Sequence, residues 1–88
     1  MTSTEVLRTE HSWILKTPGR CGGRACIRDT RIPVWSLVEA AQRLGKTNTE
    51  LLRYFVTPLT EADIQTAWAY YEQNRAEIEH DIEENENA

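Results

Sequence analysis

The chain has 88 residues, of which 40% are hydrophobic, and it carries a formal net charge of −4. This composition excludes a disordered chain, and no stretch approaches the roughly 18 apolar residues that a membrane-spanning helix needs. Six basic and three acidic residues give residues 1–31 a net charge of +3. One basic and nine acidic residues give residues 56–88 a net charge of −8. These unlike ends predict one surface for an anionic partner and another for a basic partner.

The N-terminal residues 1–12 are expected to form a flexible arm. Because no positively charged start precedes an apolar run there, we expect no leader peptide and a cytoplasmic location. The apolar run Trp13-Ile14-Leu15 predicts either a first strand or an apolar arm that lies on the core. The run stops at Thr17-Pro18-Gly19, which favours a turn.

The two cysteines, Cys21 and Cys26, are too few for a disulfide framework, and their spacing lacks the second ligand pair of a structural zinc site. His11 and His80 lie far away in the sequence. We therefore expect two reduced thiols that pack as small side chains, with no metal site and no cofactor.

Two short strands are predicted around a turn at Asp29. Whether the turn is centred on residues 28–29 or 29–30, one face of the pair is apolar and should be buried, and it consists of Ala25, Ile27, Ile32 and Val34. Pro33 has no amide hydrogen, so the second strand must be an edge strand or must end there.

Helices are expected after this hairpin. The first begins at about Pro33, has apolar residues with a 3.6-residue period and ends at Gly45. The second begins at a capping box formed by Thr47 and Glu50 and ends before Pro58.

The third helix has a doubly marked start, with a capping box of Thr60 and Asp63 and a hydrophobic staple of Leu59 and Ile64. A heptad-like seam then indicates one helix over residues 61–84, and its members are Ile64, Trp68, Tyr71, Arg75, Ile78 and Ile82. At 1.5 Å per residue this helix would be about 36 Å long, so its last two turns should leave the core.

These elements predict a mainly α fold: a three-helix bundle of the helix-turn-helix kind, preceded by a short β-strand or hairpin region and ending in a long C-terminal helix. We place a single domain at residues 13–76 and an acidic helical extension at residues 77–88.

Arginines surround the predicted hairpin, where an anion would relieve their mutual repulsion. With two basic residues near the end of the first helix they form a candidate nucleic-acid or anion-binding set, namely Arg20, Arg24, Arg28, Arg31, Arg43 and Lys46. The alternative is a solvated strand edge on which some arginines pair with Asp29 or Glu39.

Trp35 and Tyr70 lie off the apolar stripes of their helices, and we expect them to be exposed at a protein interface. Together with the end of the seam they form a candidate partner-binding set, namely Trp35, Tyr70, Arg75, Ile78 and Ile82. We recognise no nucleophile with a base, no phosphate-binding glycine loop and no paired carboxylates, so we predict that the protein is not an enzyme.

The segment Cys21-Gly22-Gly23-Arg24-Ala25-Cys26-Ile27-Arg28-Asp29-Thr30-Arg31-Ile32-Pro33-Val34-Trp35 closely resembles the family called domain of unknown function 433. The similarity extends over roughly residues 13–82 and includes Leu44-Gly45 and Ala67-Trp68-Ala69-Tyr70-Tyr71. The resemblance implies a homeodomain-like helical domain with a short N-terminal strand region, often a dimer. Some members look like antitoxins of VapB type, encoded beside a toxin with a PIN-like ribonuclease fold. The long acidic tail is not part of the family pattern.

Our hypothesis from the sequence is a small, dimeric, non-enzymatic binding protein that acts as an antitoxin. Its hairpin would contact DNA as an autorepressor, and residues 75–86 would order on the toxin and mask a basic RNA-binding surface. The alternative is a homodimeric structural or interaction module without toxin or DNA, in which the seam of the third helix completes the dimer.

Overall fold

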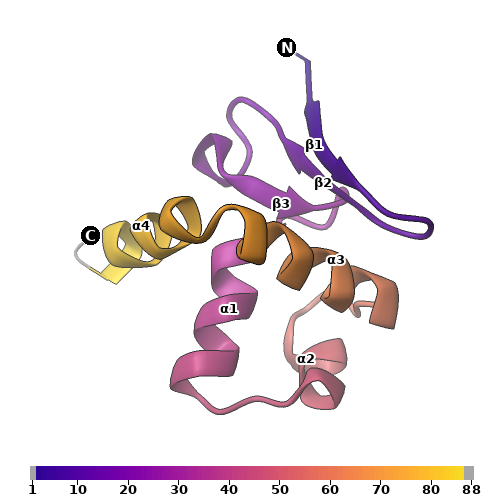
Figure 1. Cartoon of the computed structure of the whole chain (residues 1–88), viewed down its shortest axis with the longest axis vertical. Helices are drawn as coiled ribbons and strands as arrows, with labels where there is room; N and C mark the ends of the chain where they lie inside the picture. The colour runs from indigo at the N-terminus through magenta and orange to yellow at the C-terminus, as the bar shows by residue number, and fades with distance from the viewer. Residues whose placement is uncertain (1, 87–88) are drawn as a thin grey trace.

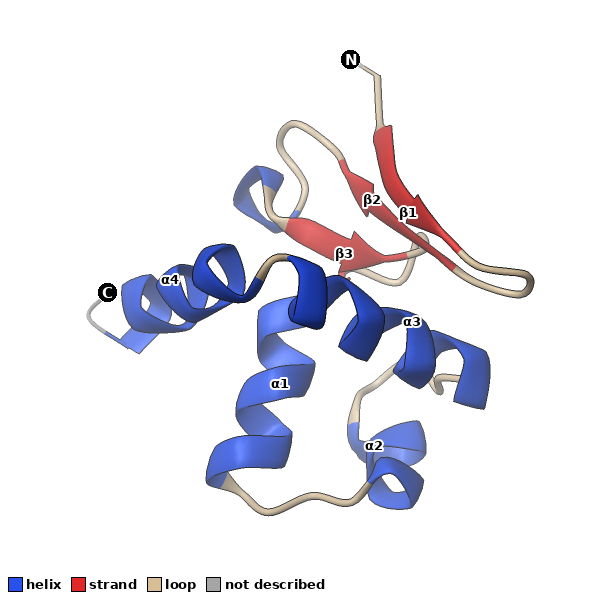
Figure 2. Ribbon diagram, viewed as in Figure 1, coloured by secondary structure: helices blue, strands red, loops and turns tan. Residues whose placement is uncertain are grey.

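The computed structural model describes residues 2–86 and contains four strands, a short 3₁₀ helix and four α-helices (Figure 1). The sheet is formed by the N-terminal part of the chain and the helices follow it, which makes an α+β fold (Figure 2). The predicted mainly α, three-helix homeodomain-like or helix-turn-helix bundle is therefore wrong. Two features overturn it: an N-terminal strand that the sequence did not reveal, and a break within the predicted long helix.

The sheet is antiparallel, with the strand order β1-β2-β3-β4. β1 (Thr4–Arg8) pairs with β2 (Trp13–Lys16), β2 pairs with β3 (Ala25–Ile27), and β4 (Ile32–Pro33) forms the other edge. Residues 4–8 are thus a paired strand and not part of a flexible arm, because their backbone bonds to β2. The run at Trp13 is a strand, as one of its two interpretations proposed, but it is the second strand of the sheet.

β3 and β4 form the predicted hairpin. Ile27 pairs with Ile32 and Cys26 with Pro33, which centres the turn on residues 29–30. The predicted apolar face is confirmed, since its members are at most 6% exposed, namely Ala25, Ile27, Ile32 and Val34. Pro33 ends an edge strand, where its lack of an amide hydrogen breaks no sheet bond.

The helix starts and the end of the first helix agree with the sequence analysis. α1 (Val34–Arg43) stops before Gly45, whose φ of 67° lies in the left-handed region. α2 (Asn48–Tyr54) starts at Thr47, and α3 (Glu61–Gln73) starts at Thr60; both predicted capping boxes are present.

The predicted helix over residues 61–84 is divided at Asn74, whose φ and ψ of −137° and 43° are not helical. The side-chain amide of Asn74 donates to the Tyr70 carbonyl at 3.1 Å and so caps the end of α3. α4 (Arg75–Glu86) is a separate helix that contacts α1 (Figure 1). Its Ile78 is fully buried, so the expectation that the last turns leave the core is wrong.

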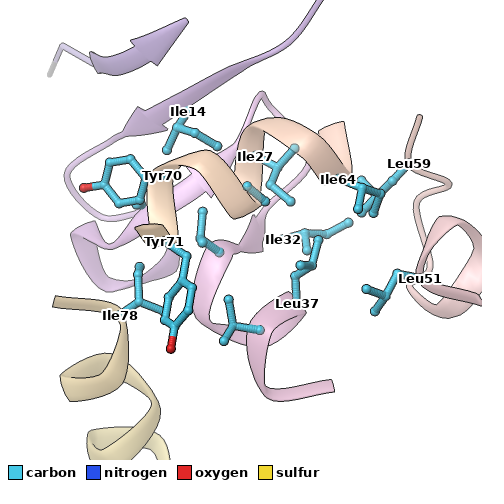
Figure 3. Close-up of a cluster of buried hydrophobic side chains, with 14 of the residues drawn as sticks. Ile14, Ile27, Ile32, Leu37, Leu51, Leu59, Ile64, Tyr70, Tyr71 and Ile78 are labelled. Atoms are coloured by element: carbon cyan, nitrogen blue, oxygen red, sulfur yellow. The ribbon is translucent and has the colours of Figure 1, made fainter. Parts of the chain in front are cut away.

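The core lies where the sheet, α1, α3 and the start of α4 meet (Figure 3). Tyr70 is only 3% exposed, which contradicts the expectation that it lies on the surface. Trp35 is partly buried against the same core. Three residues of the predicted seam, Ile64, Tyr71 and Ile78, are at most 5% exposed, so the seam that was to join two chains is used largely within this one.

The β2–β3 connection is tied to the sheet, because Cys21 in the 3₁₀ helix (Cys21–Gly23) forms a disulfide with Cys26 in β3. The prediction of two reduced thiols is wrong. Within residues 2–86, no helix is both long enough and apolar enough to cross a membrane.

Candidate functional site

The arginines of the predicted anion-binding set do not share one surface. Arg28 makes a two-pronged contact with Asp63, with Nε and Nη2 each donating to a carboxylate oxygen at 2.7 Å. Arg24 places Nη2 at 2.6 Å from Glu84 and Nε at 3.4 Å from Asp81. Because carboxylates of the same chain hold both guanidinium groups, neither is well placed to bind an external anion.

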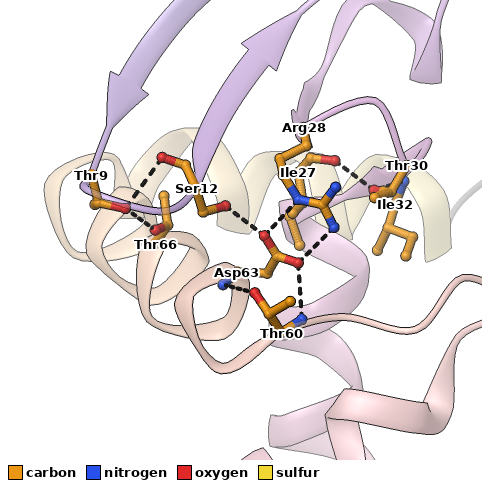
Figure 4. A network of polar contacts seen from close by, with 9 residues as sticks. All are labelled: Thr9, Ser12, Ile27, Arg28, Thr30, Ile32, Thr60, Asp63 and Thr66. Carbon is orange, nitrogen blue, oxygen red and sulfur yellow. Dashed lines mark hydrogen bonds and ion pairs between the residues drawn. The ribbon is translucent and has the colours of Figure 1, made fainter.

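Asp63 is the centre of a polar cluster beneath the sheet (Figure 4). It is fully buried, and it accepts hydrogen bonds from the Ser12 hydroxyl at 2.6 Å and from the Thr60 amide at 2.9 Å. Burial alone would raise the pKa of Asp63, but the hydrogen bonds from Arg28, Ser12 and Thr60 lower it to about 2. The carboxylate is thus charged and joins the sheet to the start of α3.

This cluster was missed by the sequence analysis, which treated Asp63 only as a helix cap. The Thr9 and Thr66 hydroxyls, 2.7 Å apart, extend it to the β1–β2 connection. Its contacts join residues 35, 51 and 57 positions apart, from Arg28 to Asp63, Ser12 to Asp63 and Thr9 to Thr66. No local pattern reports contacts of this range; the only sequence signal was an acidic residue at a capping position.

Arg20 and Arg31 differ from the other hairpin arginines. Both line a cavity of about 320 Å³ beside the β2–β3 loop, together with Thr17, Pro18, Gly19 and Cys21. Within residues 2–86, the one ion pair of Arg20 is distant, 3.8 Å from an Asp29 side chain that is 78% exposed. Among the described residues Arg31 has no ion-pair partner. Arg20 and Arg31 are therefore the hairpin arginines that retain an open positive charge.

Arg43 and Lys46 lie at the other end of α1. α1 begins directly after β4, and nine residues of helix place Arg43 about 14 Å further along. Lys46 places Nζ at 5.4 Å from the centroid of the Tyr54 ring. The six basic residues therefore do not form one continuous site.

The two faces of α4 differ in how their carboxylates are paired. On the inner face, Glu77 lies 3.1 Å from Lys16, and Asp81 contacts Arg24. On the outer face, Glu79 and Glu83 are exposed, and no cation of the described residues pairs with either. Glu79 accepts a hydrogen bond from the Tyr71 hydroxyl at 3.0 Å.

The predicted partner-binding residues are mostly internal. Tyr70 donates to Glu77 at 2.9 Å, and burial raises the pKa of its hydroxyl. Ile78 is in the core, and Ile82 and Trp35 are partly buried. Only Arg75 is exposed, with its guanidinium carbon 5.1 Å from the centroid of the Tyr71 ring.

Within the part of the chain that the structure describes, no three side chains of His, Cys, Asp or Glu are grouped as metal ligands. The arrangement offers two features for binding: the positive cavity at Arg20 and Arg31, and the acidic outer face of α4.

Comparison with known proteins supports the family that the sequence resembles. The family model described as Protein of unknown function (DUF433) matches residues 14–71. The chain is also similar to a DUF433 member protein from Anabaena variabilis ATCC 29413 whose crystal structure is known. The two sequences are 51% identical, the structures superpose with a TM-score of 0.70, and the match covers 78% of this chain and 66% of that chain. A search of curated proteins gives no match. The chain therefore belongs to the DUF433 family, whose function is unknown.

Proposed function

We propose that the protein is a non-enzymatic binding protein of antitoxin type, which uses the outer face of α4 to bind a basic surface of a partner protein. The partner would be a ribonuclease toxin of PIN-like fold, whose RNA-binding surface must be basic. This proposal rests on the family resemblance and on the charge of α4.

The observation that carries the proposal is the unpaired charge of Glu79 and Glu83. They are four residues apart on a helix, where like charges destabilise by a few tenths of a kcal/mol. Glu83 also lies near the C-terminal end, where the helix dipole disfavours a negative charge. Glu79 accepts a hydrogen bond from the Tyr71 hydroxyl, but neither residue stabilises the free chain through an ion pair. A basic partner would supply that pairing.

The structure changes how this surface would act. The sequence suggested that residues 75–86 order on a toxin, but they already form a helix anchored by Ile78. Recognition would therefore use a preformed surface, which avoids the cost of ordering a disordered segment. DNA binding receives less support, because Arg24 and Arg28 are held by internal carboxylates.

The test is co-expression of the full chain with the product of its neighbouring gene, followed by light scattering. We expect a stable complex whose affinity falls at least about tenfold in the double variant Glu79→Gln/Glu83→Gln, a loss of about 1.4 kcal/mol. Glutamine retains an acceptor for the Tyr71 hydroxyl, so the fold should be unaffected.

The matched control is Glu10→Gln/Glu61→Gln, which removes the same charge from exposed positions outside α4. It should bind as the unchanged chain does, and added salt should weaken both complexes. A full chain that captures nothing, or an α4 variant that binds as tightly as the control, would refute the proposal.

A further inference from the structure

The cavity beside the β2–β3 loop has the size and charge of a small-ligand site. Its volume of about 320 Å³ is at the lower end of the range for such pockets, roughly 300–1,000 Å³. None of its lining residues is acidic, and two are arginines, Arg20 and Arg31. It shares no residue with the outer face of α4.

The loop that forms the cavity wall is held in place by its own turns. The Arg20 amide donates to the Thr17 carbonyl at 3.0 Å, and Gly19 has a φ of 81°, as a type II turn requires. The Gly23 amide then donates to the Arg20 carbonyl at 2.9 Å. The disulfide from Cys21 to β3 anchors the same loop, so the wall exists before any ligand binds.

Arg31 also lines the cavity, and it lies at the end of the β3–β4 turn. Its backbone φ of 62° lies in the left-handed region, which is unfavourable for a residue with a side chain. Arg28, at the start of the same turn, also has a positive φ, of 45°, so this conformation belongs to the turn. At Arg31 it accompanies a guanidinium group that no carboxylate of the described residues neutralises.

We propose that this cavity binds the phosphate group of a small phosphorylated ligand, with Arg20 and Arg31 as the two donors. A guanidinium group offers a planar fork of N–H donors that matches two phosphate oxygens. A small ligand is favoured over a nucleic acid because Asp29 lies 3.8 Å from Arg20 and because the whole chain has a net charge of −4. An extended polyanion would meet these negative charges.

The experiment is a titration of the full chain, followed by amide NMR, with inorganic phosphate and then glycerol phosphate at constant ionic strength. We expect saturable shifts at Thr17, at residues 19–21 and at Arg31, and no such shifts with chloride. Arg20→Gln and Arg31→Gln should each weaken binding by about tenfold or more, as expected for loss of a hydrogen bond to a charged group.

Two further variants serve as controls. Arg31→Lys keeps the positive charge but replaces the planar fork of donors by an ammonium group, so it should bind phosphate more tightly than Arg31→Gln and less tightly than the unchanged chain. Arg53→Gln removes the same charge from an exposed position on α2 and should leave binding unchanged.

Three results would overturn the proposal. One is the absence of saturable shifts with either phosphate probe. Another is equal binding by the Arg20→Gln/Arg31→Gln variant while its spectrum remains that of the folded chain. The last is tighter binding of a short DNA duplex than of glycerol phosphate, lost in the same double variant, which would assign the site to a nucleic-acid backbone.

Discussion

Asp63 serves two structural purposes with one carboxylate. It completes the capping box of α3 by accepting from the Thr60 amide, and it accepts from Arg28 and Ser12 across the interface with the sheet. Removing one partner of such a buried pair is costly, because it leaves the other charge without compensation. The residue therefore links helix formation to docking of the sheet.

The lowered pKa of Asp63 predicts acid sensitivity. Its pKa is about 2 in the folded chain, below the ordinary value of 3.8, so its contribution to stability is present above about pH 4 and is lost as the pH falls towards 2. The difference corresponds to about 2 kcal/mol. Urea unfolding between pH 7 and pH 2 should show this loss in the unchanged chain.

The matched comparison is Asp63→Asn, which should be less stable at pH 7 and should lose less stability with acid. Burial raises the pKa of Asp81, so its effect on the pH dependence of stability is opposite to that of Asp63. Asp81 is present in both proteins, so its contribution cancels when the two are compared. Equal loss of stability in the two proteins between pH 4 and pH 2 would contradict the assigned role of Asp63.

At the scale of the elements, α4 is held by one buried apolar side chain and by ion pairs at its inner face. Ile78 is fully buried, whereas Ile82, one turn later, is only partly buried. Arg24 contacts both Asp81 and Glu84, and Lys16 contacts Glu77. The attachment of α4 should therefore depend mainly on Ile78, since partly exposed ion pairs contribute little.

Ile78→Ala should lower the free energy of unfolding by about 3 kcal/mol, the usual cost of a large buried side chain. Hydrogen exchange should become faster throughout α4 and at the end of α1 that it covers. The matched control, Ile82→Ala, should cost about 1 kcal/mol, because less apolar surface leaves water there. Equal costs for the two variants would show that α4 is not anchored in this way.

The sequence predicted those elements that local chemistry determines. Both capping boxes, the apolar face from Ala25 to Val34 and the stop at Gly45 were identified correctly, because each depends on residues within a few positions. The break at Asn74 was missed because the heptad spacing continues across it, while tertiary packing directs Ile78 into the core. β1 was missed because its stability comes from pairing with β2.

The same distinction explains the candidate site. Arginines near the turn could be counted from the sequence, but which of them keep an open charge depends on carboxylates 35 or more positions away. Asp63 pairs with Arg28 and Glu84 pairs with Arg24, whereas Arg20 and Arg31 line the cavity. The sequence thus identified the basic residues but could not show which carboxylate pairs with which of them.

At the scale of the whole molecule, the unlike ends of the chain partly neutralise each other. The basic N-terminal part supplies Lys16, Arg24 and Arg28, and the acidic C-terminal part supplies their partners in α3 and α4. The charge asymmetry that suggested two external partners is therefore used in part inside the fold. The charges that remain outside the fold include two arginines at a cavity and two glutamates on α4.

A chain that ends at Asn74 should lose most of its cooperative thermal unfolding. Truncation would expose the part of the core that Ile78 covers, and it would remove Asp81 and Glu84, the ion-pair partners of Arg24. A domain of this size buries little surface on folding, so it cannot lose this contribution and stay stably folded. Circular dichroism melting tests this, with a chain ending at Glu84 as the control that should melt within a few degrees of the full chain. If the chain ending at Asn74 melted at the same temperature as the full chain, α4 would be dispensable for folding.

If the chain ending at Asn74 is unfolded, deletion of α4 cannot separate partner binding from folding. Substitution of Glu79 and Glu83 on the intact helix is then the way to test partner binding by itself.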